Sequence, residues 1–439
     1  MTDAPTSDAA ATGGTCEDLL AFIGKAPSPY HAVAEATRRL LDAGWTKVAL
    51  DGPWPEGPGR HLVARGGALV AWDASGPGID ATSPLRIVGA HTDSPNLRIK
   101  PHPDTGSAGW QQLAVEVYGG ALWNSWLDRD LGLSGRVVVR VDGELETRLF
   151  HCDCALLRIP QLAIHLDRDV NGQGLKLNPQ QHLTPVWGVG PVEHGAFVAH
   201  LAEEVDVAPD QVVSWDAMVH DTTPGTLLGR RHELVASARL DNLLSCWAGI
   251  SALAAGPLAS LPAPTLPVVC LFDHEEVGST SATGADGALL AQVLERIGLA
   301  LGGGREELLR SVAGSACASV DMAHATHPNY PERHEPGHHV AIDGGPVIKL
   351  NANQRYATDA ETSALLIEAC ERAGVPHQAF VSRNDQPCGS TIGPLTSARL
   401  GIPTADIGVA QLSMHSAREL CGAEDPGRLA AALGAFLHP

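Results

Sequence analysis

Short apolar runs that end abruptly in polar residues recur along the chain, and they predict buried strands. Leu266–Phe272 is the clearest example, because a compact run rich in β-favouring residues is followed at once by Asp273-His274-Glu275-Glu276. Further runs of this kind are Leu85–Gly89, Cys317–Val320, Val347–Leu350, Gln378–Val381 and Thr404–Gly408. A short continuous apolar run is typical of a parallel strand that is buried on both faces.

Segments with helical spacing of apolar residues lie between these strands. In His31–Leu41, for example, Val33, Ala36 and Leu40 fall on one face of a helix. Other predicted helices are Leu243–Ala255, Gly287–Ile297, Thr358–Ala373 and a terminal helix. This alternation predicts an α/β fold, in which a mostly parallel mixed sheet carries helices on both faces.

The middle of the chain has a different texture. Ala114–Tyr118, Arg136–Val141 and Glu144–Phe150 alternate like antiparallel strands, and Asp142-Gly143 marks a hairpin turn between two of them. We interpret residues 96–236 as an inserted β-rich domain. It interrupts a first domain that comprises residues 1–95 and 237–439, with polar Met1–Thr15 as a disordered tail.

Composition narrows the class of protein. The net charge of −20 argues against nucleic acid or an anionic membrane as a partner. Of the nine cysteines only Cys152 and Cys154 lie close together, so we expect reduced thiols rather than a disulfide framework. No apolar stretch reaches transmembrane length, and Met1–Thr15 lacks the apolar region of a signal peptide. We therefore expect a soluble cytoplasmic protein.

Five histidine and carboxylate side chains share one position relative to the predicted strands. They follow an apolar strand or, for one of them, stand where a strand gives way to a helix: His91, Asp241, Glu276, Asp321 and His415. All would project from the carboxyl edge of the sheet, where open α/β sheets bind their ligands. Two histidines and three carboxylates form a donor set that Zn²⁺, Mn²⁺ or Co²⁺ accepts.

Five ligands are too many for one catalytic ion with an open position, but they suit two ions if a carboxylate bridges them. The adjacent Glu275 and Glu276 diverge from each other, so one can bind metal while the other stays free as a base. Asp93 is a natural acceptor for the second ring nitrogen of His91. The alternatives are an exposed acidic turn and ordinary helix caps, and the joint placement favours a metallohydrolase.

The motifs together resemble the aspartyl aminopeptidase family of dinuclear zinc aminopeptidases. The matching stretches run in family order from Ala90 to Glu419: AHTDSPNLRIKP, WNSWLDRDLGLSGRV, LRIPQLAIHL, SARLDNL, FDHEEVGS, DMAHATHPNYPERHE, GPVIKLNANQRYATD, NDQPCGSTIGP and QLSMHSARE. Upstream of LLRIP the sequence HCDC departs from the family pattern, which leaves the local structure there open.

The resemblance implies a dinuclear aminopeptidase-like catalytic domain and a role for each candidate residue. His91, Asp241 and Asp321 would bind the first ion, and Asp241, Glu276 and His415 the second. The expected cofactors are two divalent ions per subunit, with Zn²⁺ preferred and Mn²⁺ or Co²⁺ as alternatives. A metal-bridged hydroxide, with Glu275 as general base, would remove unblocked N-terminal residues, preferring Asp or Glu, from peptides.

The same resemblance implies a homo-oligomer. The insert would drive dimerisation, and the dimers would build a dodecamer. His165 would reach the active site of a neighbouring subunit, while His324, Lys349 and Tyr356 would line the substrate pocket. A lysine suits a substrate side chain that carries a carboxylate.

Two alternative functions remain open from the sequence. An N-acyl amidohydrolase or deacetylase could use the same dinuclear site on a blocked amine. A non-catalytic assembly or cargo protein could hold the metals for structure alone, although a structural site needs no free base beside its ligands, such as the Glu275-Glu276 pair offers.

Overall fold

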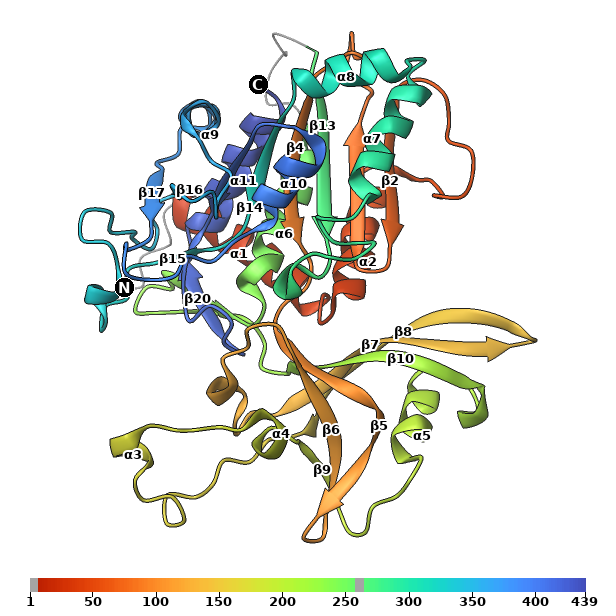
Figure 1. The fold of residues 1–439 in the computed structure, drawn as a ribbon, viewed down its shortest axis with the longest axis vertical. Helices are drawn as coiled ribbons and strands as arrows, with labels where there is room; N and C mark the ends of the chain where they lie inside the picture. The colour runs from red at the N-terminus through yellow and green to blue at the C-terminus, as the bar shows by residue number, and fades with distance from the viewer. Residues whose placement is uncertain (1–6, 257–263) are drawn as a thin grey trace. The chain divides into compact units, whose positions relative to one another are not determined.

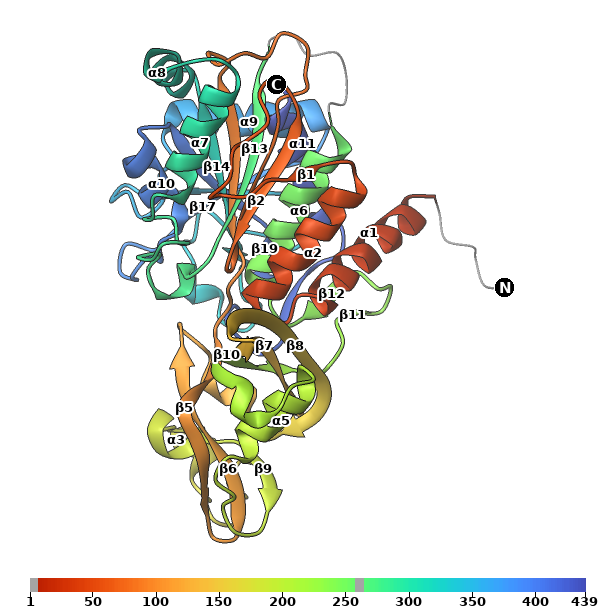
Figure 2. The same cartoon turned by 90° about the vertical axis from the view of Figure 1, so that its right-hand side faces the viewer.

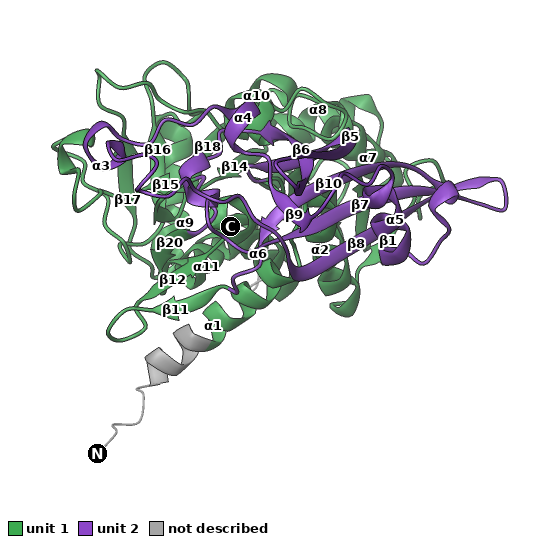
Figure 3. Cartoon of the chain, turned by 90° about the horizontal axis from the view of Figure 1, so that it is seen from below, with its two compact units in different colours: residues 1–93, 225–414, 419–439 green, residues 94–224, 415–418 purple. Residues whose placement is uncertain are grey.

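The computed structural model of the protein describes residues 7–256 and 264–439 and divides the chain into two compact units. The first unit comprises residues 1–93, 225–414 and 419–439, and the second comprises residues 94–224 and 415–418 (Figure 3). Within the described ranges, every helix is too short or too polar to cross a membrane.

A nine-stranded sheet forms the centre of the first unit (Figure 1). In spatial order its strands are β1 (Thr46–Lys47), β2 (Arg60–Arg65), β3 (Ala68–Asp73), β13 (Leu266–Phe272), β4 (Leu85–His91), β14 (Ala316–Val320), β18 (Thr404–Gly408), β16 (Val347–Leu350) and β17 (Gln378–Val381). The four central strands, from β13 to β18, are parallel, whereas β3 runs antiparallel to both of its neighbours and β16 runs antiparallel to β18 but parallel to β17. The predicted mostly parallel mixed sheet is confirmed.

Helices cover both faces of this sheet, as the sequence predicted. One face carries α1 (Ser7–Gly24), α2 (Pro29–Asp42), α6 (Leu240–Ala255), α9 (Ala360–Ala373) and α11 (Asp425–Leu437), and the other carries α7 (Leu289–Ala300), α8 (Arg305–Ala313) and α10 (Ile392–Leu400). Figure 2 shows α2 and α6 on one side and α7 and α10 on the other. Along β13, Val269 and Leu271 pack toward the first group, and Val268 and Cys270 toward the second. This alternation explains why the whole strand is apolar.

A second, five-stranded sheet completes the first unit. Its order is β11 (Thr226–Leu228), β12 (Leu234–Ser237), β20 (Glu419–Gly422), β19 (Ala410–Leu412) and β15 (Ala323–His324). Because β12 pairs with β20, residues 225–236 belong with the first unit, although the sequence analysis assigned them to the insert.

The second unit is an antiparallel six-stranded sheet with a helix packed on it. The strands, in spatial order, are β8 (Glu144–Leu157), β7 (Leu131–Val141), β10 (Val212–Asp221), β5 (Asn96–Ser107), β6 (Trp110–Tyr118) and β9 (Val186–Val189). Phe197 and Leu201 of α5 (Ala196–Glu204) join the core of this unit, and α3 (Val170–Gln173) and α4 (Pro179–His182) are single turns.

Three local features differ from the sequence-based predictions. Helix α1 already begins at Ser7, inside the stretch predicted as a tail, because Ala9–Ala11 favours helix; residues 1–6 lie outside the described part. A strand was predicted at Val48–Leu50, but β1 lies at Thr46–Lys47. Helices α8 and α10 were not predicted.

Cys152 and Cys154 form a disulfide, so the expectation of reduced cysteines is wrong for this pair. The two residues are separated by one position on β8, and their Cα atoms are 5.4 Å apart, within the range that a disulfide spans. The other seven cysteines are free thiols, and all of these except Cys388 are buried.

Candidate metal centre

The central residues of the site lie at the ends of neighbouring strands and at the start of a helix. Strand β4 lies between β13 and β14 and runs parallel to both, so the carboxyl ends of all three meet at one edge of the sheet. His91 is the last residue of β4, and Asp321 directly follows β14. Asp241 comes from the first turn of α6. All three are buried, with exposed fractions of 1%, 8% and 3% for His91, Asp321 and Asp241.

These three side chains converge. The Nε2 atom of His91 lies 3.4 Å from Oδ1 of Asp241 and 3.5 Å from Oδ1 of Asp321. Burial alone would lower the pKa of His91, but the contacts with Asp241 and Asp321 outweigh it and raise that pKa well above its usual range. One imidazole nitrogen between two buried carboxylates is a donor arrangement that fits one divalent cation.

The turn after β13 brings two more carboxylates to the same edge. His274 adopts a left-handed conformation (φ 64°), which ends the strand and opens the short 3₁₀ turn Glu275–Val277. Donor atoms of Glu275, Glu276 and His91 lie within 4.8 Å of one another. The two glutamates are therefore neighbours of the His91 cluster.

Asp93 fixes this turn. Its carboxylate accepts hydrogen bonds from the backbone N–H groups of Glu275 and Glu276, each at 3.1 Å. The backbone oxygen of Asp93 also lies 3.0 Å from Nδ1 of His91, and its Oδ1 lies 3.4 Å from that nitrogen. Asp93 thus holds His91 by its Nδ1 side, and the Nε2 side faces Asp241 and Asp321.

The site concentrates negative charge where water cannot screen it. Burial, reinforced by the carboxylates of Asp321, Asp93 and Asp241, raises the pKa of Glu275 to about 8, although His91 works in the opposite direction. The pKa of Glu276 is also raised well above its usual range, first by burial and then by Asp241. Divalent cations would relieve this repulsion, so the residues present fit a metal centre of more than one ion.

Three supporting residues were not singled out from the sequence. Glu419 accepts a hydrogen bond from the backbone N–H of Asp241 at 3.0 Å. Asn242 donates from Nδ2 to the carbonyl of Val320 at 2.8 Å, and the thiol of Cys246 contacts the carbonyl of His91 at 2.9 Å. Glu419 and Asn242 lie within the motifs SARE and LDNL, and that signal could have identified them.

The residues expected in a substrate pocket gather around Phe380. Lys349 pairs with Phe380 across β16 and β17. The rings of His324 and Tyr356 lie 6.2 and 6.3 Å from that of Phe380. Lys349 is buried: its Nζ donates to the Met322 carbonyl at 3.1 Å and lies 3.6 Å from Oδ2 of Asp321.

His165 and His415 belong to the second unit. His165 is exposed in the turn that follows Ala163. His415 opens the segment 415–418, and its Nδ1 lies 3.1 Å from the carbonyl oxygen of Gly120. The roles predicted for both histidines stay predictions.

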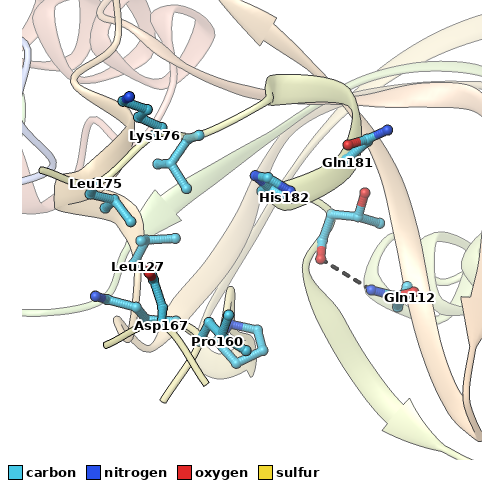
Figure 4. A pocket seen from close by; sticks show the side chains of 12 residues that line it. Gln112, Leu127, Pro160, Asp167, Leu175, Lys176, Gln181 and His182 are labelled. Carbon is cyan, nitrogen blue, oxygen red and sulfur yellow. Dashed lines mark hydrogen bonds between the residues drawn. The ribbon is translucent and has the colours of Figure 1, made fainter. Parts of the chain in front are cut away.

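The second unit also contains a pocket of about 440 Å³ (Figure 4). Pro160, Leu175 and His182 are among its lining residues, and Gln112 donates a hydrogen bond from its side chain to the carbonyl of Thr184 at its wall. None of the residues that line it is a predicted site residue.

Comparison with known proteins identifies relatives along the whole chain. Residues 22–437 match the family model described as aminopeptidase I zinc metalloprotease (M18). The chain is 56% identical over 427 residues to a probable M18 family aminopeptidase 2 of Streptomyces coelicolor, covering 97% of this chain and 98% of that protein.

Solved structures agree with this match. A chain in a structure of the Ape4 and Nbr1 complex superposes with a TM-score of 0.94 at 35% identity, covering 99% of this chain and 87% of that one. A chain of the mApe1 dodecamer of S. cerevesiae superposes with a TM-score of 0.84 at 27% identity, covering 97% and 96%.

Proposed function

The chain belongs to the M18 family of zinc aminopeptidases, and from this premise we propose that it removes Asp or Glu from the free N-terminus of peptides at a two-ion site. Membership in the family makes the protein a metal-dependent aminopeptidase, and therefore a hydrolase. The observation that carries the proposal is the buried His91, which faces Asp241 and Asp321 beside the Glu275-Glu276 turn.

In the proposal, His91, Asp241 and Asp321 hold one zinc ion, and Asp241, Glu276 and His415 hold the second. The donor distances around His91 and the crowding of buried carboxylates support the first set, and the motif QLSMHSARE supports His415. When bound, the ions supply Lewis acidity, which lowers the pKa of water and polarises the peptide carbonyl.

Glu275 is the proposed general base. Its side chain lies beside the cluster but outside the two proposed ligand sets, so it can accept the proton of the attacking water and return it to the leaving amine. Asp93 positions this base, because its carboxylate holds the backbone N–H groups of Glu275 and Glu276. Cations nearby would favour the ionised form of Glu275 that a base requires.

The acidic preference rests on Lys349, with His324 and Tyr356 around the same Phe380. The ammonium of Lys349 lies 5.2 Å from the Tyr356 ring and would supply positive charge beside a substrate carboxylate. We further propose that the protein acts in the cytoplasm as a homo-oligomer of dimers, up to a dodecamer. There His165 of one copy would complete the site of another, and the similarity to a dodecameric mApe1 supports this assembly.

The assignment of the base is tested by Glu275→Gln. We expect kcat to fall by roughly 10³-fold, because general-base catalysis contributes about 10²–10⁴-fold, while the zinc content stays unchanged. Glu306→Gln, at an exposed position of α8, is the matched control and should keep wild-type kcat. Near-normal kcat in Glu275→Gln would assign the base to another group.

The substrate proposal is tested with a panel of Asp-, Glu-, Asn- and Leu-p-nitroanilides and N-acetyl-Asp-p-nitroanilide. We expect kcat/KM for the Asp substrate to exceed that for Asn by about tenfold or more, the scale of one favourable charge contact. The acetylated substrate should not be cleaved. A Leu substrate cleaved best would refute the acidic preference but not the aminopeptidase activity, and cleavage of only the blocked substrate would favour the amidohydrolase alternative.

A further inference from the structure

Two histidines and an aspartate lie together in the second unit, and none of them is among the residues proposed for peptide cleavage. Donor atoms of His151, Asp153 and His220 all lie within 4.8 Å of one another. We propose that these three residues form a separate metal site that binds one divalent first-row ion, with Zn²⁺ as the expected occupant. This site is independent of the proposed aminopeptidase function.

The register of the six-stranded sheet places the ligands on one face. Strand β7 lies between β8 and β10, and it pairs His151 with Ser134 and His220 with Gly132. Gly132 and Ser134 are two residues apart on one strand, so both histidines stand on the same side of the sheet. Asp153 lies two residues beyond His151 on β8, and its carboxylate reaches the donor atoms of both histidines.

Gly132 leaves room for the His220 ring. A Cβ atom at position 132 would lie only 2.7 Å from Nε2 and 2.9 Å from Cε1 of His220, and closer still to the backbone carbonyl oxygen of Cys152, so the imidazole and this carbonyl share the space above the glycine. The centroids of the His151 and His220 rings are 5.2 Å apart with an interplanar angle of 62°. The absence of a side chain at Gly132 of β7 thus lets His151 of β8 and His220 of β10 approach each other.

The donors suit zinc. Two imidazoles and one carboxylate form a common three-ligand set, which leaves one position for water. Two ligands that bind one ion at about 2.0–2.2 Å can be up to roughly 4.4 Å apart, so small side-chain rotations would bring these donors onto an ion. His220 is 3% exposed, and such burial would shield the ion on the side of the sheet.

A second group of potential metal ligands, which includes a cysteine, offers an alternative site in the same unit. Cys152, His200 and Glu204 also have donor atoms within 4.8 Å of one another. In this structure Cys152 is tied to Cys154 in a disulfide and offers no thiolate. The histidine–aspartate cluster is therefore the favoured site.

The test counts ions on the full-length protein. Wild type, His151→Asn, Asp153→Asn and the control Asp210→Asn, at an exposed position of the same unit, are saturated with Zn²⁺ and desalted, and bound zinc per chain is measured by mass spectrometry. We expect the first two variants to hold one ion fewer than wild type and Asp210→Asn. Turnover should stay within twofold of wild type in all four proteins, which separates this site from the aminopeptidase site. Equal zinc content in all four would overturn the proposal and leave the two histidines as a packed pair.

Cobalt binding supplies a second readout that does not depend on tight zinc retention. On titration with Co²⁺, wild type should show a component in the visible absorption that Asp153→Asn lacks. Cys152→Ser should retain this component, because no thiolate contributes to the site. Loss of the component in Cys152→Ser, together with its survival in Asp153→Asn, would assign the ion to the cysteine-based site and refute the proposal.

Discussion

The carboxyl edge of the nine-stranded sheet and the face of the six-stranded sheet both bring imidazoles and carboxylates together, but in different ways. At the edge, His91 is the last residue of its strand, and Asp321 and the Glu275-Glu276 turn follow strands that have already ended. On the face, His151 and His220 lie within strands, where the ladder itself fixes their spacing.

The charge balance also differs. Five carboxylates crowd the edge, where burial, and after it the neighbouring carboxylates, raise the pKa of Glu275 to about 8. The cluster of His151, Asp153 and His220 on the face of the six-stranded sheet (the face cluster) has one carboxylate for two imidazoles. A surplus of carboxylates can hold two cations and still leave a base free, which hydrolysis needs. A balanced cluster holds one ion and leaves no base. The comparison teaches that the surplus of acid groups, more than the presence of histidine, distinguishes a reactive centre.

The largest effect is expected from removing the proposed bridging charge at the edge. Asp241→Asn should lower kcat/KM by roughly 10³-fold or more and reduce bound zinc, because both ions lose a charged ligand. Metal analysis and turnover of the same sample measure both effects. Asp216→Asn, which removes the carboxylate of the Arg136 ion pair in the second unit, should change neither. Normal zinc content in Asp241→Asn would exclude the bridging role.

An intermediate effect is expected at Asp93. Asp93→Asn weakens the acceptor for the Glu275 and Glu276 N–H groups, and residues that orient ligands typically contribute about 10–100-fold. We expect this loss in kcat with little change in KM, since the residue positions the base. A change confined to KM would indicate a role in substrate binding instead.

The packing beside the face cluster is tested by measuring the free energy of unfolding. Gly132→Ala should lower the free energy of unfolding by about 1–3 kcal/mol, because the new methyl group collides with the backbone carbonyl of Cys152 and with the His220 ring. Gly172→Ala, in α3, where a Cβ would meet no atom within 4 Å, is the control and should not destabilise the protein. Chemical denaturation of the two variants measures the difference, and equal midpoints would show that the cluster tolerates a side chain at position 132.

The smallest expected effect is a pH dependence of the metal-free protein. The pKa of Glu275 rises from 4.5 to about 8 on folding, so its contribution to stability is fully present below pH 4.5 and is lost as pH rises toward 8. Metal-free Glu275→Gln lacks this loss and should gain at least ~1 kcal/mol over metal-free wild type between pH 5 and 9, since one pKa unit corresponds to about 1.4 kcal/mol. Thermal unfolding of both apoproteins measures the gain, and a difference that is constant with pH would contradict it.

Much of the fold was predictable because strand and helix periods are local properties. The strands β13, β16, β17 and β18 were predicted with the bounds that the structure has. Domain edges were harder, because β12 is assigned to the first unit by its pairing with the distant β20. Sequence separation hides such a partner.

The site was predictable where a polar residue follows an apolar strand, as at His91 and Asp321. Asp93 was expected to serve His91, but its grip on two backbone N–H groups depends on the turn at His274, which no side-chain pattern encodes. The face cluster was not predicted at all. Histidines within alternating strands resemble ordinary polar positions until the register places them on the same face of the sheet, on either side of β7.

The two hydrogen bonds that the Asp93 carboxylate accepts have a consequence for protein engineering. In the Glu275-Glu276 turn this carboxylate binds backbone N–H groups, which any side chain leaves in place. The two hydrogen bonds therefore tolerate a change of sequence in the turn but not a loop with a different backbone shape. A recombined gene with a crossover between codons 93 and 275 would combine the anchor of one parent with the loop of another. Functional hybrids should therefore inherit these two segments together, or draw them from parents whose loops have the same length.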